Sequence, residues 1–288
     1  MPGMSPPPPT RSESEYALPA PGTPRKAYST DMTDEEWDVY QRFFPEHVGH
    51  PGLSAPTTSV RELLNAMRYR KRTSCQWRNL PNDVPKWDKV TRYFYKWRNE
   101  GRFEALRAYA TAAAREAEGR SAHPTAASID TQSVKTTSVG GPKGFDGAKK
   151  VKGRKRAIAV DALGLLLTVI VVVASVTEGK CGARLLRKLH AEHPTVSLVF
   201  ADLGFRKDVV DEASAETGIA VELSSKPSGA PGFVPLKLRW KVERTYGWFT
   251  FFRVLSKDYD RTIASAQAWI DLTMADVALR RFAHAHAS

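Results

Sequence analysis

Cysteine is scarce in this chain, and its scarcity excludes two classes of protein. The 288 residues include only two cysteines, Cys75 and Cys181. Two thiols build neither a disulfide scaffold nor a cysteine-rich zinc module, and they suit a reducing cytosol. Long apolar segments are missing too, because the longest run, from Leu163 to Ala174, falls short of the roughly 20 residues that span a bilayer. The N-terminus also lacks the apolar core of a signal peptide, so we expect a cytoplasmic protein with no membrane partner.

Acidic residues are outnumbered, and this imbalance points to a type of partner. The chain has 31 Asp and Glu against 43 Lys and Arg, a formal net charge of +12. Such an excess is typical of proteins that bind polyanions, and nucleic acid is favoured here because no membrane segment is present. Hydrophobic residues make up 42% of the chain, enough for a sizeable core in one large domain or two smaller ones.

We expect three regions along the chain. Residues 1–31 contain a run of four prolines and are predicted to form a disordered tail. Residues 32–120 show helical periodicity, beginning with a capping-box pattern at Thr33 and Glu36, and predict a small all-helical domain. Residues 121–288 alternate short apolar runs with helical segments, which predicts an α/β domain.

One helix of the second region combines an apolar face with a basic one. It is expected over residues 87–99. Its predicted core residues are Val90, Phe94 and Trp97. The basic residues left for a DNA groove, as in a helix-turn-helix recognition helix, are Lys89, Arg92 and Lys96. An ordinary amphipathic helix with a solvated basic face is the alternative.

The third region predicts a mixed five-stranded sheet with flanking helices. Its apolar stretch of residues 168–173 is rich in β-branched residues and suits a buried central strand. The five expected strands cover residues 126–130, 156–161, 165–174, 197–201 and 219–223.

Three acidic residues stand out by their position. Asp130 and Asp202 each follow an apolar strand, and Glu243 lies inside a predicted helix. Sites in α/β sheets form at the carboxyl ends of strands, where grouped carboxylates repel one another unless a cation neutralises them. Oxygen-only ligands favour Mg²⁺ or Mn²⁺, and two such ions assist phosphoryl transfer. Singly, each aspartate is as readily a turn former or helix cap, and the glutamate a surface ion-pair partner.

Several motifs in a fixed order resemble the bacterial insertion-sequence transposases of the DDE type. The resemblance extends over roughly residues 32 to 283. In the last two thirds of the chain it is carried by residues 129–135, 140–146, 149–156, 200–202, 239–245 and 255–259. In the helical region it is carried by residues 33–37, 75–81 and 92–94.

The resemblance implies both a fold and a reaction. It implies an RNase-H-like domain behind a helix-turn-helix-like domain, with Asp130, Asp202 and Glu243 as the catalytic, metal-binding acids. The implied cofactor is a pair of Mg²⁺ ions, with Mn²⁺ as a substitute, and the implied reaction is DNA strand cleavage followed by strand transfer. The implied partners are double-stranded DNA, as terminal inverted repeats and as target, and a second copy in a homodimer on DNA. A nucleoid-associated location in the bacterial cytoplasm follows.

A basic, glycine-containing segment directly follows the first strand. Between residues 134 and 156 it holds eight Lys and Arg and a single acid. Charges at this density repel each other without a polyanion, so we favour contact with the DNA backbone over a solvated hairpin. The predicted DNA-binding residues here are Lys135, Lys149, Lys150, Lys152, Arg154, Lys155 and Arg156.

Basic residues around the third acid are further DNA candidates. They are Arg239, Arg244, Arg253 and Lys257. Two departures from the family pattern, Leu203 and Thr250, leave room for a second hypothesis, a decayed transposase that still binds DNA. A third hypothesis is a nuclease of the same fold that cleaves DNA without joining ends.

Overall fold

The computed structural model describes residues 25–45, 58–205, 208–223 and 239–286. The predicted tail of residues 1–31 therefore lies mostly outside the described residues. Residues 25–31 contact the helical region. The Arg25 guanidinium donates hydrogen bonds to Asp31 and to Glu62 of that region, at 2.7 Å in each case. Such charge-assisted bonds hold the segment against the helical region.

Among the described residues of the region that was predicted to be helical, four α-helices are present. They are α1 (Asp34–Tyr40), α2 (Val60–Thr73), α3 (Trp87–Asn99) and α4 (Arg102–Ala117), with a short 3-10 turn, η2 (Trp77–Asn79), between α2 and α3. The capping box at the start of α1 is present as predicted, with reciprocal bonds between Thr33 and Glu36. The predicted core face of α3 is also confirmed, because Val90, Phe94 and Trp97 are buried.

The third region forms a mixed sheet, as predicted, but the described residues contribute six strands to it. They are β1 (Ala126–Lys135), β2 (Gly144–Asp146), β3 (Val151–Val160), β4 (Leu166–Val173), β5 (Leu198–Ala201) and β6 (Ala220–Leu223). The order is β4-β3-β1-β5-β6, with short β2 paired to the first residues of β3. Strands β1, β3 and β4 are antiparallel neighbours, whereas β1, β5 and β6 run parallel.

The prediction of five strands missed part of the basic segment. Strand β1 continues five residues past Asp130, and β3 begins at Val151 rather than at residue 156. The antiparallel pairing of Ser128–Lys135 with Gly153–Val160 satisfies the backbone of residues that are too polar to signal a strand by themselves.

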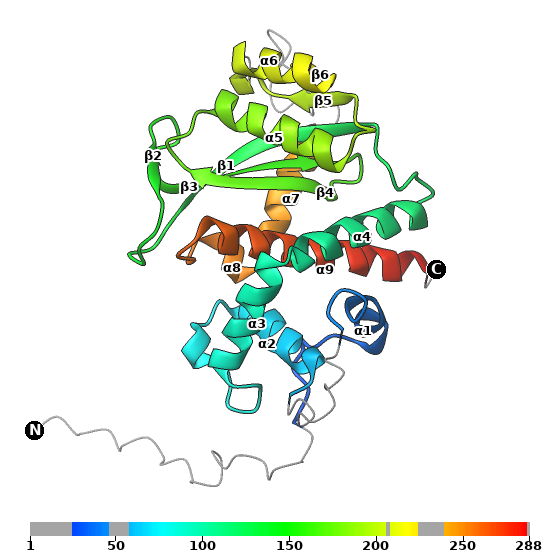
Figure 1. Ribbon diagram of the computed structural model, residues 1–288, viewed down its shortest axis with the longest axis vertical. Helices are drawn as coiled ribbons and strands as arrows, with labels where there is room; N and C mark the ends of the chain where they lie inside the picture. Colours follow the sequence, from blue (N-terminus) through cyan, green and yellow to red (C-terminus); the bar gives the residue numbers. More distant parts are fainter. Residues whose placement is uncertain (1–24, 46–57, 206–207, 224–238, 287–288) are drawn as a thin grey trace, which may run out of the picture.

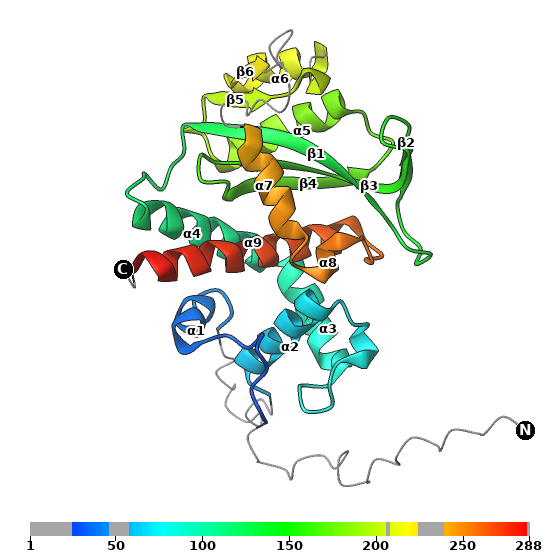
Figure 2. The same cartoon turned by 180° about the vertical axis from the view of Figure 1, so that it is seen from behind.

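Helices cover both faces of the sheet (Figures 1 and 2). The remaining helices are α5 (Glu178–Glu192), η3 (Leu203–Phe205), α6 (Asp208–Thr217), α7 (Arg239–Phe249), α8 (Arg253–Ser256) and α9 (Ile263–His286). Helices α5 and α6 lie on one face, and α7 crosses the other face, which also receives α4 and α9. Within the described ranges, no helix has the length and apolarity to cross a bilayer.

Two hydrophobic cores result from this layering. The smaller one joins the sheet to α5 and α6 through residues such as Leu185 and Val199. The larger one joins the other face to α7 and α9 and continues without a break into α1–α4, so that Ile158 of β3, Phe103 of α4 and Trp269 of α9 belong to one cluster. Side chains from both sides of the boundary predicted near residue 120 therefore pack in one hydrophobic core.

Candidate functional site

Asp130 and Asp202 emerge from neighbouring strands in the middle of the sheet. Strands β1 and β5 run parallel, and their last register pair joins Ser128 to Phe200. Each aspartate follows its member of that pair by two residues, so the two lie at the same level along the strands. Asp130 is half-buried within β1, and Asp202 is half-buried directly after β5. Both acids were singled out in the sequence by the apolar runs that they follow, and their shared role stays a prediction.

The turn after β5 is shaped by a glycine. The Gly204 backbone N–H donates a hydrogen bond of 2.9 Å to the Asp202 carboxylate. A Cβ atom added at Gly204 would lie 2.3 Å from Glu178 Oε2 and 3.0 Å from Asp202 Oδ1. Glycine at this position therefore lets two carboxylates approach the same backbone segment.

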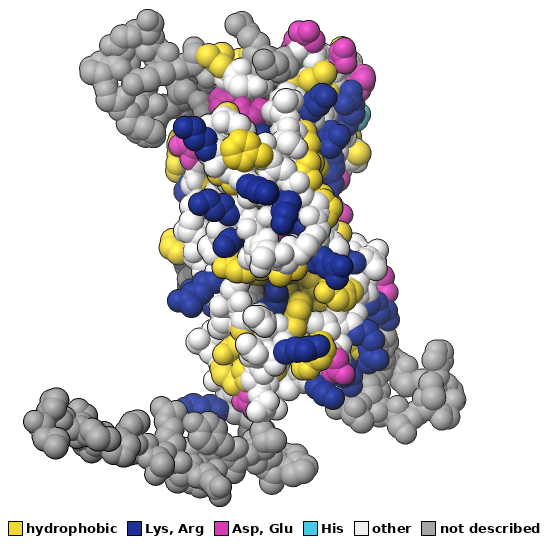
Figure 3. Space-filling view, turned by 90° about the vertical axis from the view of Figure 1, so that its left-hand side faces the viewer, with side chains coloured by type: hydrophobic (Ala, Val, Ile, Leu, Met, Phe, Trp, Pro, Cys, Tyr) yellow, Lys and Arg dark blue, Asp and Glu magenta, His cyan; other side chains and the backbone are white. Residues whose placement is uncertain are grey.

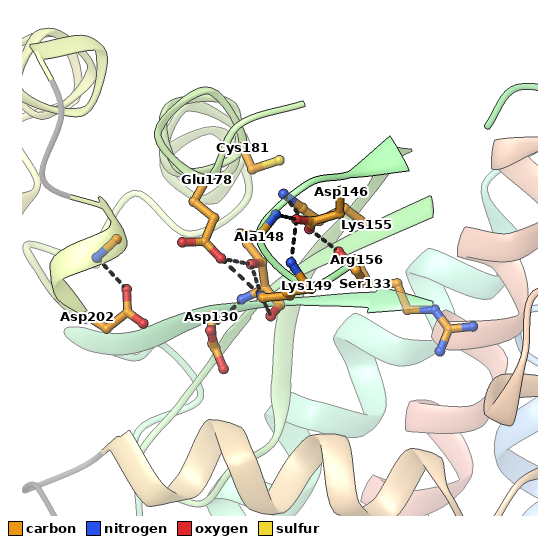
Figure 4. Close-up of polar contacts among 12 residues, drawn as sticks. Asp130, Ser133, Asp146, Ala148, Lys149, Lys155, Arg156, Glu178, Cys181 and Asp202 are labelled. Carbon is orange, nitrogen blue, oxygen red and sulfur yellow. Dashed lines mark hydrogen bonds and ion pairs between the residues drawn. The ribbon is translucent and has the colours of Figure 1, made fainter. Parts of the chain in front are cut away.

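Helix α7 carries the third predicted acid past β1. The Tyr246 hydroxyl lies 2.9 Å from both the Asp130 and the Arg156 carbonyl oxygens, so it ties α7 to β1 and β3. Glu243 precedes Tyr246 by three residues, and residues at this spacing are neighbours on a helix surface. Glu243 itself is exposed. Figure 4 shows the Asp130 side chain directed toward the ribbon of α7.

The chemistry of these three carboxylates suits a hard divalent cation. All of their donors are oxygens, the ligands that Mg²⁺ and Mn²⁺ prefer. Within residues 25–45, 58–205, 208–223 and 239–286, no three His, Cys, Asp or Glu side chains are gathered at the spacing of a metal centre. The donor set thus fits a metal, whereas a closed coordination shell is not formed by the described side chains.

Glu178 is a fourth carboxylate at this site, which sequence reasoning did not assign. It lies in the first turn of α5, accepts a 3.0 Å hydrogen bond from the Thr131 hydroxyl, and pairs with Lys149 Nζ at 3.0 Å (Figure 4). Burial opposes ionisation of Glu178, but the hydrogen bond and charge of Lys149 outweigh it and lower the pKa of Glu178. Its only sequence signal was an acid after the N-cap that follows β4.

Asp146 anchors the turn between β2 and β3. Its carboxylate accepts bonds from the Ser133 hydroxyl at 2.6 Å and from the backbone N–H groups of Ala148 and Lys149, and it pairs with Lys155 at 3.1 Å. Burial opposes ionisation, yet these donors hold the pKa of Asp146 far below its usual range. The hairpin that carries the basic residues is therefore fixed beside β1.

Three of the predicted DNA-binding residues are buried, so they are not available to contact DNA. Arg154, Lys155 and Arg156 are 1%, 4% and 1% exposed. Arg154 donates to both Asp258 oxygens at 3.0 Å, and Arg156 donates to the Leu255 carbonyl at 2.7 Å. Arg154 thus joins β3 to the segment after α8, Arg156 joins β3 to α8, and Lys155 contacts the Val176 carbonyl and Asp146, so a DNA backbone outside the protein does not reach them.

The other basic residues of this segment remain on the surface. Those that are exposed are Lys135, Lys143, Lys149, Lys150 and Lys152. Phe145 lies among them on β2 and is 57% exposed. Figure 3 shows Lys and Arg side chains gathered over this side of the molecule. A cationic surface with an aromatic side chain has the composition of a nucleic-acid interface.

The basic face of α3 is only partly exposed. Arg92 and Lys96 are exposed and flank the Tyr93 ring, at 5.9 and 6.0 Å from its centroid. Lys89 is half-buried, and its ammonium donates a 2.6 Å hydrogen bond to the Thr58 hydroxyl.

The basic residues near Glu243 differ from one another in their exposure and contacts. Arg244 lies between the rings of Trp240 and Trp248, 4.6 and 4.9 Å from their centroids, and donates to the Leu163 carbonyl at 2.6 Å. The Arg239 side chain lies outside the described residues. Farther along the chain, Arg253 is exposed and Lys257 half-buried.

Family models match most of the chain. Residues 121–275 match the model described as "Transposase DDE domain". Residues 32–107 match the model described as "Putative transposase of IS4/5 family".

Two individual proteins are more distantly similar. An uncharacterized protein, y4sN of Sinorhizobium fredii, is 30% identical over 66 residues, which are 23% of this chain and 51% of that protein. The chain therefore spans about half the length of this curated relative. The crystal structure of the Mos1 mariner paired end complex with Mn aligns over 87% of this chain and 86% of its own, with 10% identity and a TM-score of 0.28.

Proposed function

The chain belongs to the family of DDE-domain transposases, and from this premise we propose that it cleaves DNA strands at the ends of an insertion sequence and transfers them to target DNA. The proposed catalytic residues are Asp130, Asp202 and Glu243. The observation that most supports the proposal is the register of β1 and β5, in which Asp130 and Asp202 each follow the Ser128–Phe200 pair by two residues, and α7, which bears Glu243, packs against β1.

We propose that these carboxylates also hold the metal. Their oxygens would bind divalent ions, in the finer form of the proposal two Mg²⁺ ions with Mn²⁺ as a substitute. When bound, such ions supply charge stabilisation at a phosphodiester and a more acidic attacking hydroxyl. The chain's own contribution is positioning, because Tyr246 fixes α7 against the Asp130 backbone and the Gly204 N–H orients Asp202.

The proposed DNA surface has two parts, one on the β2–β3 side of the acids and one on α3. Its members are Lys135, Lys149, Lys150, Lys152, Arg253 and Lys257, together with Arg92 and Lys96 of α3. Lysines supply point charges to phosphates and add salt dependence to binding rather than base specificity. Double-stranded DNA is the proposed partner, as terminal repeats and as target, and two copies of the chain are proposed to act together on it.

The test is cleavage by matched variants. Asp202→Asn and Asp130→Asn should lower Mg²⁺-dependent cleavage of a plasmid that carries the gene's flanking DNA by about a thousandfold, because each removes several kcal/mol of metal-mediated stabilisation. DNA affinity should remain near the wild-type value. The control is Asp211→Asn, which removes an exposed carboxylate from α6.

Three results separate the hypotheses. Joined DNA products that depend on Asp202 support a transposase, and ends without joining support a nuclease. Tight DNA binding without cleavage by any protein, in Mg²⁺ and again in Mn²⁺, would instead identify a decayed DNA-binding relative. Equal loss of cleavage and binding in Asp202→Asn would mean that Asp202 serves folding.

A further inference from the structure

A polar pocket lies between α2 and α9, away from the carboxylates of the sheet. Its volume is about 290 Å³. The lining side chains that matter here are Thr30, Arg68, Lys71, Arg72, Asp276 and Arg280. Arg68, Lys71 and Arg72 come from the basic run of α2, which no part of the proposed function uses.

Positive charge exceeds negative charge around this pocket. Four of the lining residues are cationic and one, Asp276, is acidic. Arg68 also donates two hydrogen bonds, of 2.7 and 2.9 Å, to Glu36, which does not line the pocket. With Glu36 included, four cations still face only two carboxylates.

The single carboxylate of the pocket is already engaged. One Asp276 oxygen accepts a hydrogen bond from the Tyr40 hydroxyl and the other pairs with Lys71 Nζ. Arg68 Nε lies 3.6 Å from the same carboxylate. These donors neutralise Asp276 and leave little of its charge to repel an anion.

Two arginines and a hydroxyl are available to a ligand. Among the described residues, neither Arg72 nor Arg280 has a carboxylate partner, although Arg72 donates to the Phe251 carbonyl at 2.9 Å. The Thr30 hydroxyl oxygen is buried and meets no hydrogen-bond partner in the part of the chain that the structure describes. Buried polar atoms normally have a hydrogen-bond partner, so we expect a ligand or a water molecule to bind the Thr30 hydroxyl.

The pKa of Lys71 is set first by burial and then by the charges around it. Burial lowers the pKa of the Lys71 ammonium, the nearby Arg68 and Arg280 lower it further, and Asp276 opposes both, with a resulting pKa of about 8. The Tyr40 hydroxyl on the far side of Asp276 stays neutral, because burial raises its pKa. An anion in the pocket would stabilise the charged form of Lys71.

We propose that this pocket binds a phosphate group through Arg72, Arg280 and Lys71. Guanidinium groups match phosphate geometry with paired N–H donors, and a phosphate dianion would balance the two uncompensated charges. The phosphate belongs either to the backbone of bound DNA or to a free anion. This site goes beyond the proposed function, since it uses none of the catalytic carboxylates.

The experiment compares charge-removing variants of the full chain. Arg280→Gln and Arg72→Gln alter the pocket, and Arg184→Gln removes an exposed arginine from α5 as the matched control. Melting temperature is measured against inorganic phosphate at constant ionic strength. Affinity for a short DNA duplex is measured at several salt concentrations without divalent metal.

The two measurements distinguish the sources of the phosphate. A free anion should raise the melting temperature of wild type and Arg184→Gln but not of the pocket variants. A backbone phosphate should appear as a loss of DNA affinity of about tenfold in Arg280→Gln, with a salt slope lower by about one. The proposal is overturned if the pocket variants match Arg184→Gln in both measurements. Neither measurement requires DNA cleavage, so the test of the phosphate site can be interpreted even if the transposase proposal fails.

Discussion

Buried charged side chains are frequent in this chain, and acids from other segments pair with many of them. Among the described residues, six ion pairs have both members nearly inaccessible to solvent: Arg68–Asp276, Lys71–Asp276, Arg107–Asp271, Arg115–Asp161, Arg154–Asp258 and Lys155–Asp146. Such pairs recover the cost of burying charge only when both members are present. Part of the excess of basic residues is therefore structural and does not contribute to the DNA surface.

Asp276 gives a pH-dependent test at the scale of one residue. Burial opposes its ionisation, but Arg68, Lys71 and Tyr40 outweigh it and lower its pKa to about 2. A lowered pKa stabilises the fold above the ordinary aspartate value of about 4, and this stabilisation is lost as the pH falls toward 2. The free energy by which wild type exceeds Asp276→Asn in urea unfolding should shrink by about 2 kcal/mol between pH 5 and pH 2. A constant difference would contradict the assigned pairing.

At the scale of elements, the β2–β3 hairpin depends on close backbone contact between β1 and β3. Gly153 pairs with Lys135 of β1 and with Gly144 of β2. A Cβ atom at Gly153 would lie only 1.9 Å from the Val134 carbonyl oxygen. Only glycine allows β3 to bind both strands at this point.

Gly153→Ala should therefore destabilise the chain. The added methyl group must push β1 and β3 apart, which we expect to lower the free energy of unfolding by about 1–3 kcal/mol. Gly147→Ala in the adjacent turn is the control, because its added Cβ meets no described atom within 4 Å. Chemical denaturation of the two variants checks this expectation, and equal stability of both would refute it.

At the scale of the whole molecule, α4 joins the helical region to the sheet. Its Arg107 is 1% exposed and donates to Asp271 of α9 at 2.8 Å, and it also donates to the carbonyl oxygens of Leu166 and Leu167 at the start of β4. Phe103 and Leu106 of α4 lie in the core that includes α9. The last helix of the chain thus completes the packing of the first region.

A fragment of residues 25–120 should not fold by itself. Without α9 it would expose the apolar face of α4 and leave Arg107 without its buried partner, and both changes are costly. We expect no cooperative thermal transition for the fragment and one transition for the full chain, measured by circular dichroism. A cooperative transition in the fragment would show that residues 32–120 form an independent domain.

The sequence by itself determined the features that depend on neighbouring residues. The capping box at Thr33, the buried face of α3 and the apolar strand β4 follow from local spacing, which sets hydrogen bonding and the side of burial. The fold class followed from the order of such elements. Asp130 and Asp202 were recognisable because each follows an apolar run, and their catalytic role stays a prediction.

Only the tertiary structure decided which charges are buried and which strands are paired. Arg154 and Asp258 are 104 residues apart, so no local pattern indicated that this arginine belongs to the interior. The extension of β1, the contact of Glu178 with Lys149 and the pocket between α2 and α9 likewise depend on segments that meet only after folding. The physical reason is that burial and pairing of polar residues are set by long-range contacts, whereas local periodicity records only the apolar faces.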